Sequence, residues 1–266
     1  MVDYRSWEPW YEAIREAFGY SLEEDERAAR ILDDLLSDFD IQEALKRARE
    51  LLKGKTVLVF GAGPNLEEHL KLVKEALGGL NRACITLVSA DGATAALLKA
   101  GLRPDIITTD LDGDVNAILK ANRACSLVVV HAHGDNIRAL LEHVKSFRNG
   151  FLLGTCQTRP VGRVLNFGGF TDGDRAVFMA FHLGAHRVLL TGWYFGGLVG
   201  RFSKPWLQEH VKAGKVKSMK LDFARKLLSW LASLYPGRIF VLDEEVPKAT
   251  TIGPGELASF LRGGGS

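Results

Sequence analysis

The sequence lacks the features that mark several large classes of protein. Its 34 lysines and arginines nearly balance 32 aspartates and glutamates, whereas a protein that coats nucleic acid shows a basic excess or stripe. Apolar runs are short, and none approaches the ~20 residues that a membrane-spanning helix needs. The first 18 residues mix charges among aromatic side chains and contain no signal-peptide core. We therefore expect a cytoplasmic protein that binds neither nucleic acid nor membranes.

Cysteine is also scarce. Cys84, Cys125 and Cys156 stand far apart and form no CxxC pair. Two of them lie beside or within strand-like runs, which predicts buried free thiols in a reducing cytoplasm. The G-x-x-x-x-G-K-[ST] loop, the kinase H-R-D set and the G-x-S-x-G elbow are missing as well. An enzyme of this sequence that used a nucleotide would need a different scaffold.

What is present begins with a helical segment over residues 1–53. Aromatic and aliphatic residues recur there at helical spacing and predict one buried face: Trp7, Trp10, Tyr11, Ile14 and Phe18. The run SLEE, residues 21–24, has the pattern of a capping box. We expect a helical N-terminal extension whose apolar stripe serves packing rather than ligand binding.

From Lys55 onward, short apolar runs alternate with helical segments. The expected strands are KTVLVF, ACITLVS, DIITT, SLVVVHA, FLLGT, HRVLLTG and RIFVLD, and the expected helices span about 66–77, 93–100, 114–122, 135–147, 173–183 and 217–234. Such alternation predicts an α/β domain over residues 54–262, with a mostly parallel sheet and helices on both faces. The last four residues, 263–266, are expected to form a disordered tail.

Ligands of such sheets bind beyond the carboxyl ends of the strands, and the unusual residues of this sequence gather there. After the first strand, the glycines of GAGPN would let backbone N–H groups approach a phosphate. The same run also suits a tight βα turn, and it lacks the third glycine of the dinucleotide fingerprint. After the second strand comes Asp91, which by itself is best explained as a helix cap.

The run TTDLDGD follows the third strand. Asp110 and Asp112 share one face of an extended chain, and neighbouring carboxylates repel each other unless a cation lies between them. A pair of carboxylates suits Mg²⁺, which binds one or two of them together with substrate phosphates. The alternative is an ordinary turn, and Asp114 is expected to cap the next helix. Together with Asp91, the pair predicts a Mg²⁺ site.

The run HAHGDN follows the fourth strand. His131 and His133 share a face, but no cysteine or third histidine stands at the spacing that a zinc site needs. We expect these histidines to contact phosphate or substrate, with Asp135 or Asn136 capping the next helix.

A second acidic pair, Asp172 and Asp174, opens a helix beside Arg175. Capping by Thr171 or Asp172 is one explanation, and a second metal ion or a contact to a substrate ring is the other. The later run GWYFGGLVGRFSKPW, residues 192–206, is rich in glycine, aromatic and basic residues. It is typical of a mobile flap over an anionic ligand.

In combination, the runs ADGAT, PDIITTDLDG, HAHGDN, FTDGDRA and LTGWYFGG resemble the archaeal 6-hydroxymethyl-7,8-dihydropterin pyrophosphokinase family. The similarity spans roughly residues 55–243. That family is related in fold to the catalytic domain of thiamin pyrophosphokinases, which carry a similar acidic run. Gly113 stands here where the thiamin enzymes have a serine, and the DLDG and HAHGDN runs fit the pterin family better.

The resemblance implies transfer of diphosphate from ATP to the hydroxymethyl group of the pterin, with release of AMP, in tetrahydromethanopterin or folate-type cofactor synthesis. It implies Mg²⁺ as the cofactor. The implied metal ligands are Asp91, Asp110 and Asp112, with Asp172 and Asp174 next. The implied nucleotide or phosphate contacts are Gly61, Gly63, Asn65, His131, His133, Arg175, Arg201 and Lys204. The expected pterin contacts are Asn166, Phe170, Asp172 and Trp193.

Two other functions stay open at this point. One is a thiamin pyrophosphokinase, which carries out the same chemistry on a different alcohol. The other is a non-catalytic or sugar-transferase-like relative, against which the three retained acids argue. The sequence leaves the general base, the number of metal ions and the oligomeric state, homo-oligomers included, undecided.

Overall fold

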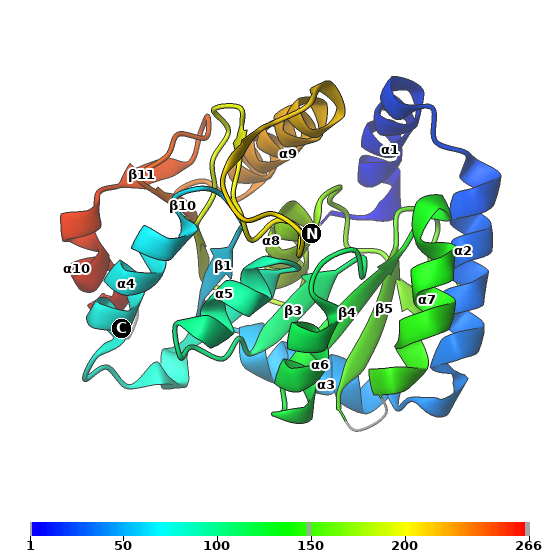
Figure 1. The fold of residues 1–266 in the computed structure, drawn as a ribbon, viewed down its shortest axis with the longest axis horizontal. Helices are drawn as coiled ribbons and strands as arrows, with labels where there is room; N and C mark the ends of the chain where they lie inside the picture. Colours follow the sequence, from blue (N-terminus) through cyan, green and yellow to red (C-terminus); the bar gives the residue numbers. More distant parts are fainter. Residues whose placement is uncertain (1, 148–149, 264–266) are drawn as a thin grey trace.

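The computed structural model describes residues 2–147 and 150–263. Apart from Gly263, the expected tail at 263–266 lies outside the described residues. Figure 1 shows one sheet flanked by helices on both faces, as the sequence predicts. Within the described part of the chain, no helix is both long and apolar enough to cross a membrane.

The main sheet has nine strands in the described residues, and its neighbouring strands pair in parallel. Their order is β11-β10-β7-β1-β2-β3-β4-β5-β6. The strands are β1 (Thr56–Phe60), β2 (Ile85–Ala90), β3 (Ile106–Thr109), β4 (Leu127–Ala132), β5 (Leu152–Cys156), β6 (Val164–Leu165), β7 (Arg187–Thr191), β10 (Ile239–Leu242) and β11 (Thr250–Ile252). This confirms the predicted mostly parallel sheet. The short strands β6 and β11 were not predicted.

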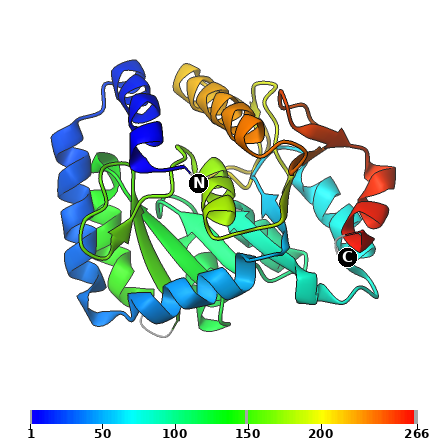
Figure 2. The same ribbon diagram turned by 180° about the vertical axis from the view of Figure 1, so that it is seen from behind.

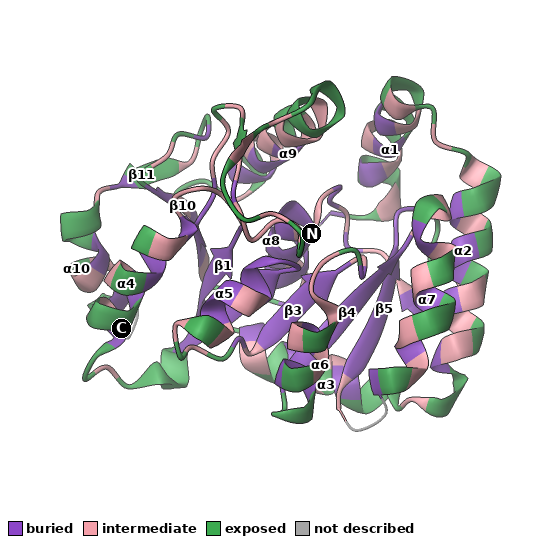
Figure 3. Cartoon of the chain, viewed as in Figure 1, coloured by how far each residue is buried: buried purple, intermediate pink, exposed green. Residues whose placement is uncertain are grey.

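Helices cover both faces of the sheet (Figures 1 and 2). The helices α4 (Leu66–Leu77), α5 (Ala93–Lys99), α6 (Val115–Arg123) and α7 (Ile137–His143) lie in front of it in Figure 1, and α3 (Ile41–Leu52) and α8 (Asp172–His182) lie behind. Two further helices, α9 (Lys215–Leu234) and α10 (Leu257–Arg262), follow later in the chain. The central strands are buried along their whole length (Figure 3), which explains their continuous apolar runs.

The N-terminal residues form α1 (Tyr4–Phe18) and α2 (Leu22–Leu35), followed by α3. Asp3 caps α1, and Gly19 ends it in the left-handed conformation that glycine adopts without strain. The hydroxyl of Ser21 accepts the N–H of Glu24, as the SLEE pattern predicts. The predicted apolar face of α1 is buried in the same core as the sheet, so the N-terminal helices pack as part of one unit.

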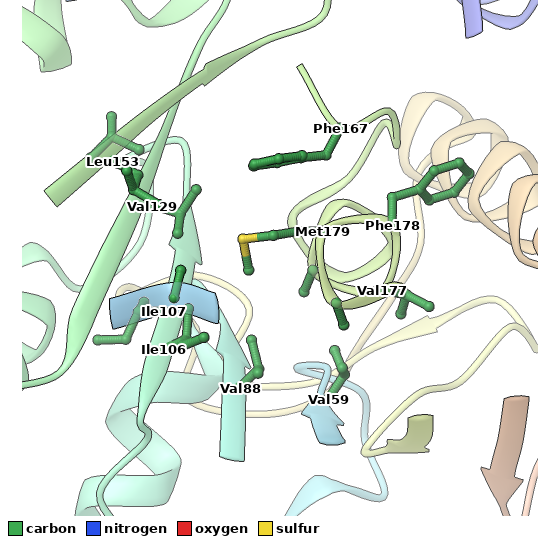
Figure 4. Packing of buried hydrophobic residues seen from close by; sticks show 14 of the residues in the cluster. Val59, Val88, Ile106, Ile107, Val129, Leu153, Phe167, Val177, Phe178 and Met179 are labelled. Carbon is green, nitrogen blue, oxygen red and sulfur yellow. The ribbon is translucent and has the colours of Figure 1, made fainter. Parts of the chain in front are cut away.

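Helix α8 is the best buried helix next to the sheet, and it fixes the position of its own first residue. Met179 and Val177 point toward sheet residues such as Ile107 and Val59 (Figure 4), while Phe178 points to the other side of the helix and lies against Trp230 of α9. Burying one such side chain contributes about 1.5–3 kcal/mol. The hydroxyl of Thr108 on β3 donates to the carbonyl oxygen of Asp172 at 2.8 Å. The start of α8 is therefore held against the carboxyl end of β3.

The expectation of buried cysteines holds for Cys156 alone. Cys84 is exposed because it ends a short 3-10 turn ahead of β2, and Cys125 is exposed because it lies in the turn after α6 with φ of +71°. None of the three is in a disulfide.

Candidate active site

A cavity of about 750 Å³ lies at the carboxyl ends of the strands, within the size range of ligand sites. One wall is the turn after β1 together with residues 192–204, and the opposite wall is made by the turns that follow β4 and β5. The acids that follow β2 and β3 lie between these walls. The first residues of α9 and the segment joining α1 to α2 also line the cavity.

Three carboxylates meet in the middle of this cavity. Asp91 follows β2, Asp110 follows β3, and Asp172 opens α8, and each offers an oxygen within 4.8 Å of the others. The Thr109 hydroxyl donates to Asp91 at 2.5 Å, which fixes that side chain. A Cβ atom on Gly113 would lie 2.0 Å from Asp91 Oδ2, so this placement of Asp91 needs glycine at position 113.

Burial and mutual repulsion set the ionisation of the three acids. Burial, with the charges of Asp110 and Asp112, raises the pKa of Asp91 to about 8. Burial and Asp110 raise the pKa of Asp172 well above its ordinary value. Burial would also raise the pKa of Asp110, but the hydrogen bond and charge of His133 outweigh it and lower that pKa. A cation bound among the three acids would therefore favour their full ionisation.

The three acids fit Mg²⁺. They offer hard oxygen ligands from three separate backbone positions, and their repulsion in a buried site is what a divalent cation relieves. Asp112 lies outside this trio: its side chain is about half exposed and pairs with Lys204 at the rim of the cavity. The predicted pair is thus divided, with Asp110 in the cluster and Asp112 beside it. Asp114 caps α6, as expected.

Asp174 is corrected from a metal ligand to a capping residue. Its carboxylate accepts the N–H groups of Phe170 and Thr171 at 2.6 and 2.8 Å, together with the Thr171 hydroxyl. It is completely buried and does not line the cavity. The capping explanation for Asp91, in contrast, was wrong, because Gly92 stands at the N-cap of α5 without a side-chain hydrogen bond.

The glycines after β1 form a tight turn rather than a phosphate loop. The N–H groups of Gly61 and Gly63 donate to the carbonyl oxygens of Thr191 and Gly192 at 2.9 and 2.7 Å. A Cβ on Gly63 would lie 2.6 Å from the Gly192 oxygen, so close approach of two backbones explains that glycine. Both glycines line the cavity, but their N–H groups are already bonded.

Asn65, unlike these two glycines, does not line the cavity. Its side chain donates to the carbonyl oxygen of Trp193 at 2.8 Å, which fastens the turn after β1 to the segment after β7. The prediction that Asn65 contacts the nucleotide is therefore replaced by a role in holding these two segments together.

The covering segment, residues 192–214, lies over this turn. Its strands β8 (Leu198–Val199) and β9 (Val211–Lys212) pair antiparallel. Arg201 is engaged by Glu67 of α4, with Nε 2.8 Å from the carboxylate, and does not line the cavity. This corrects the prediction that Arg201 contacts phosphate. Lys204 does line it.

Two lysines that the sequence analysis missed complete the basic side of the cavity. Lys217 and Lys220, in the first two turns of α9, line the same cavity as Lys204. The available signal was the basic run KVKSMK directly after Gly214.

The two histidines have different environments. His133 lines the cavity, with Nε2 3.5 Å from an oxygen of Asp110. His131 lies beneath it, with Nδ1 3.0 Å from the Thr155 hydroxyl, and lines a second, very small cavity with Arg175. Burial and the charge of Arg175 lower the pKa of His131 well below its usual value, so it is neutral. The prediction of a phosphate contact is corrected for His131.

Arg175 lies between the two cavities and lines both of them. Its guanidinium donates to Asp172 Oδ1 at 3.1 Å. It therefore remains a candidate for contact with an anionic ligand, and it also holds the third acid of the cluster.

The residues expected to contact the pterin are also divided. Phe170, Asp172 and Trp193 line the cavity. Asn166 does not: its amide donates to the carbonyl oxygens of Gln157 and Thr158 and accepts the N–H of Gly168. Asn166 therefore stabilises the loop after β5 through these hydrogen bonds. Sequence reasoning missed Tyr20, Asp25 and Gln157, which line the cavity from distant parts of the chain and carry no motif.

Comparison with known proteins gives a consistent result. A family model described as "6-hydroxymethylpterin diphosphokinase MptE-like" matches residues 33–197. A protein of Pyrococcus furiosus named 6-hydroxymethyl-7,8-dihydropterin pyrophosphokinase is 48% identical over 230 residues, covering 86% of this chain and 94% of that protein. Proteins of the same name from Methanothermobacter thermautotrophicus and Methanocaldococcus jannaschii are 42% and 37% identical, with 86% of this chain and 95% and 96% of theirs covered.

Among solved structures, the MAf glycosyltransferase from Magnetospirillum magneticum AMB-1 aligns with a TM-score of 0.44 at 13% identity. The alignment covers 88% of this chain and 42% of that one.

Proposed function

Because this chain belongs to the MptE-like 6-hydroxymethylpterin diphosphokinase family, we propose that it transfers a diphosphate group from ATP to 6-hydroxymethyl-7,8-dihydropterin. The hydroxymethyl oxygen would form a bond to the β-phosphorus of ATP and lose its proton to solvent, the bond from that phosphorus to the α-phosphate oxygen would break, and AMP would leave. The product would serve tetrahydromethanopterin or folate-type cofactor synthesis.

The observation that carries the proposal is the pairing of acids and lysines in one cavity. The trio of Asp91, Asp110 and Asp172 lies in a cavity that is also lined by Lys204, Lys217 and Lys220. A polyphosphate chain needs both groups, because its charge is neutralised by lysines on one side and by carboxylate-bound metal ions on the other. When bound, Mg²⁺ would draw negative charge from the phosphate oxygens as the β-phosphorus is attacked.

The residues of the chain itself would orient the reactants. Lys204 would hold the phosphates, while Asp112 limits its movement through their ion pair. Trp193, which the sequence analysis assigned to the pterin, is fixed by donation from Nε1 to the Val59 carbonyl oxygen at 3.0 Å. On the wall beside the turn after β1, it would present an apolar face to the nucleotide instead. Arg175 would hold Asp172 in position through their 3.1 Å hydrogen bond. Catalysis would then rest mainly on positioning and charge neutralisation.

The thiamin alternative is weakened by Gly113. The serine that the thiamin enzymes have at this position would bring a Cβ into the space of the Asp91 carboxylate, which is only 2.0 Å away. The position of Asp91 in this cluster therefore depends on glycine at position 113.

One assay tests the proposed function. With ATP and Mg²⁺, 6-hydroxymethyl-7,8-dihydropterin should yield AMP and the pterin diphosphate, whereas thiamin should not yield AMP and thiamin diphosphate at a comparable rate. A site built to pair ring N–H groups rejects ligands that lack them by about 10⁴-fold. AMP release with thiamin alone would establish the alternative. No AMP with either alcohol would favour a non-catalytic relative.

Replacing lysines that line the cavity should weaken ATP binding, whereas replacing Arg201, which lies outside it, should not. Lys204→Ala and Lys217→Ala should each raise the KM for ATP about tenfold, the effect of losing one charge-assisted contact of ~1.4 kcal/mol. Arg201→Ala should change it less than twofold, because Arg201 pairs with Glu67 outside the cavity. Initial rates at varied ATP measure all three. An equal effect of Arg201→Ala would show that the covering segment rearranges when ATP binds.

The exposed free thiols of Cys84 and Cys125 support a reducing, cytoplasmic location for this reaction.

A further inference from the structure

Gln157 is buried at one end of the cavity with its side chain uncommitted. Only 3% of the residue is exposed, yet it lines the cavity, and its Oε1 accepts no hydrogen bond from the described residues. Its backbone carbonyl accepts from Trp7 Nε1 at 2.9 Å and from Asn166 at 3.0 Å. The position of Gln157 is therefore fixed, while its amide remains available. A buried polar atom without a partner is rare in folded proteins, so the Gln157 side chain is a candidate for contact with a ligand in the cavity.

Asp25 of α2 is a second buried polar residue at the same cavity, with 4% exposed. Its two oxygens accept the Tyr11 hydroxyl at 2.7 Å and the Gly134 N–H at 2.8 Å. A carboxylate has about four acceptor positions, so capacity remains for a ligand. A Cβ on Gly134 would lie 2.8 Å from the Cβ of Glu24, so α2 and the turn after β4 are packed closely together.

Aromatic faces lie at the same end. Tyr20 and Phe170 line the cavity, with ring centroids 6.5 Å apart. Lys220 Nζ lies 5.9 Å from the centre of the first ring and 5.8 Å from that of the second. A flat, conjugated ring would find apolar surface here beside hydrogen-bonding groups.

The order of the strands separates this end from the nucleotide wall. Gln157 directly follows β5, the covering segment lies against the turn after β1, and the acids follow β2 and β3 between them. With strands spaced about 4.8 Å apart, β5 lies about 10 Å from β3. A bicyclic ring bound near Gln157 would place its side-chain hydroxyl toward the acids.

We propose that Gln157 and Asp25 recognise the hydrogen-bonding edge of the pterin ring, a deepening that rests on the proposed function. The 2-amino group of the pterin is a donor that matches the carboxylate of Asp25. The adjacent N3–H and O4 are a donor and an acceptor that match the unpaired Oε1 and the N–H of the Gln157 amide. The N-terminal helices thereby form part of the substrate site, through Tyr20 and Asp25.

The experiment measures two affinities on the full chain. Binding of the fluorescent, oxidised 6-hydroxymethylpterin is followed by quenching, and binding of ATP with Mg²⁺ is followed by calorimetry without pterin. Gln157→Leu and Asp25→Asn should each raise the Kd for pterin at least tenfold and leave the Kd for ATP within twofold. Gln42→Leu, an exposed glutamine on α3, is the control and should change neither.

Tyr11→Phe tests whether Asp25 contacts the pterin directly or only supports the structure around it. It removes one donor to Asp25 without changing the cavity lining, so its effect on pterin binding should be smaller than that of Asp25→Asn. If Asp25→Asn lowers the Tm, its effect on pterin binding could come from a loss of structure. The result for Gln157→Leu then decides whether the proposal stands, because no described residue bonds to the Gln157 side-chain oxygen.

The outcomes distinguish failure of the recognition role from failure of the proposed function. If the wild-type chain neither binds this pterin nor releases AMP with 6-hydroxymethyl-7,8-dihydropterin, the proposed function fails. If it binds pterin and Gln157→Leu binds it equally well, the recognition role is overturned while the function stands. Weaker ATP binding by Gln157→Leu, with unchanged pterin binding, would also overturn it. The nucleotide would then bind at the end of the cavity that the proposal gives to the pterin.

Discussion

Asp91→Asn and Asp110→Asn are expected to lower kcat/KM by about a thousandfold or more, with the fold retained. Each substitution removes a charged oxygen from the trio that lies within 4.8 Å. Losing a metal ligand removes several kcal/mol of transition-state stabilisation, and each 1.36 kcal/mol corresponds to a factor of ten. The measurement is the rate of AMP release at saturating Mg²⁺, with circular dichroism to verify folding.

Asp114→Asn is the matched control, since it makes the same chemical change in the same loop. Asp114 caps α6 through the N–H of Ala117 at 3.0 Å, and asparagine caps helices about as well as aspartate. Its activity should stay near that of the wild type. Asp112→Asn should have a smaller effect than Asp110→Asn, because Asp112 lies outside the trio. Near-normal activity of both Asp91→Asn and Asp110→Asn would return these residues to a structural role.

The sheet was predictable because its signal is local. Strands buried on both faces need continuous apolar runs, and each predicted run overlaps a strand of the structure. The predicted helix over 66–77 matches α4, whereas the one expected over 135–147 is a shorter α7 flanked by 3-10 turns. The two-residue strands escaped prediction because such short segments carry no periodicity.

Of the site, only the acids at the ends of β2 and β3 were predictable from the sequence. Asp91 and Asp110 directly follow adjacent strands, so sequence position alone brought them together. Asn166 and Arg201 were misassigned because their partners, the backbone of 157–158 and Glu67, are decided by packing between distant segments. Asp25 reaches the cavity through the docking of α2, which no motif in the sequence records.

Mg²⁺ should stabilise the protein more at pH 8 than at pH 5.5. Burial, with nearby acids, raises the pKa of Asp91 from 3.8 to about 8. The metal-free folded state therefore keeps a proton that the unfolded state has lost over this range. The stability that Asp91 contributes is full below about pH 4 and is lost as the pH rises through 8. Mg²⁺ binds the ionised carboxylate, so it competes strongly with that proton at pH 5.5 and much less at pH 8.

Thermal unfolding with and without Mg²⁺ at each pH measures this difference. At 100 times its Kd, a ligand adds about 2.7 kcal/mol, which raises the Tm by roughly 5–10 °C in a chain of this size. We expect that shift at pH 8 and less than half of it at pH 5.5. Comparing the two states at one pH cancels the contribution of histidines away from the acids, such as His69 and His182. Asp91→Asn should abolish most of the shift at pH 8, whereas an equal shift at both pH values would mean that Mg²⁺ binds elsewhere.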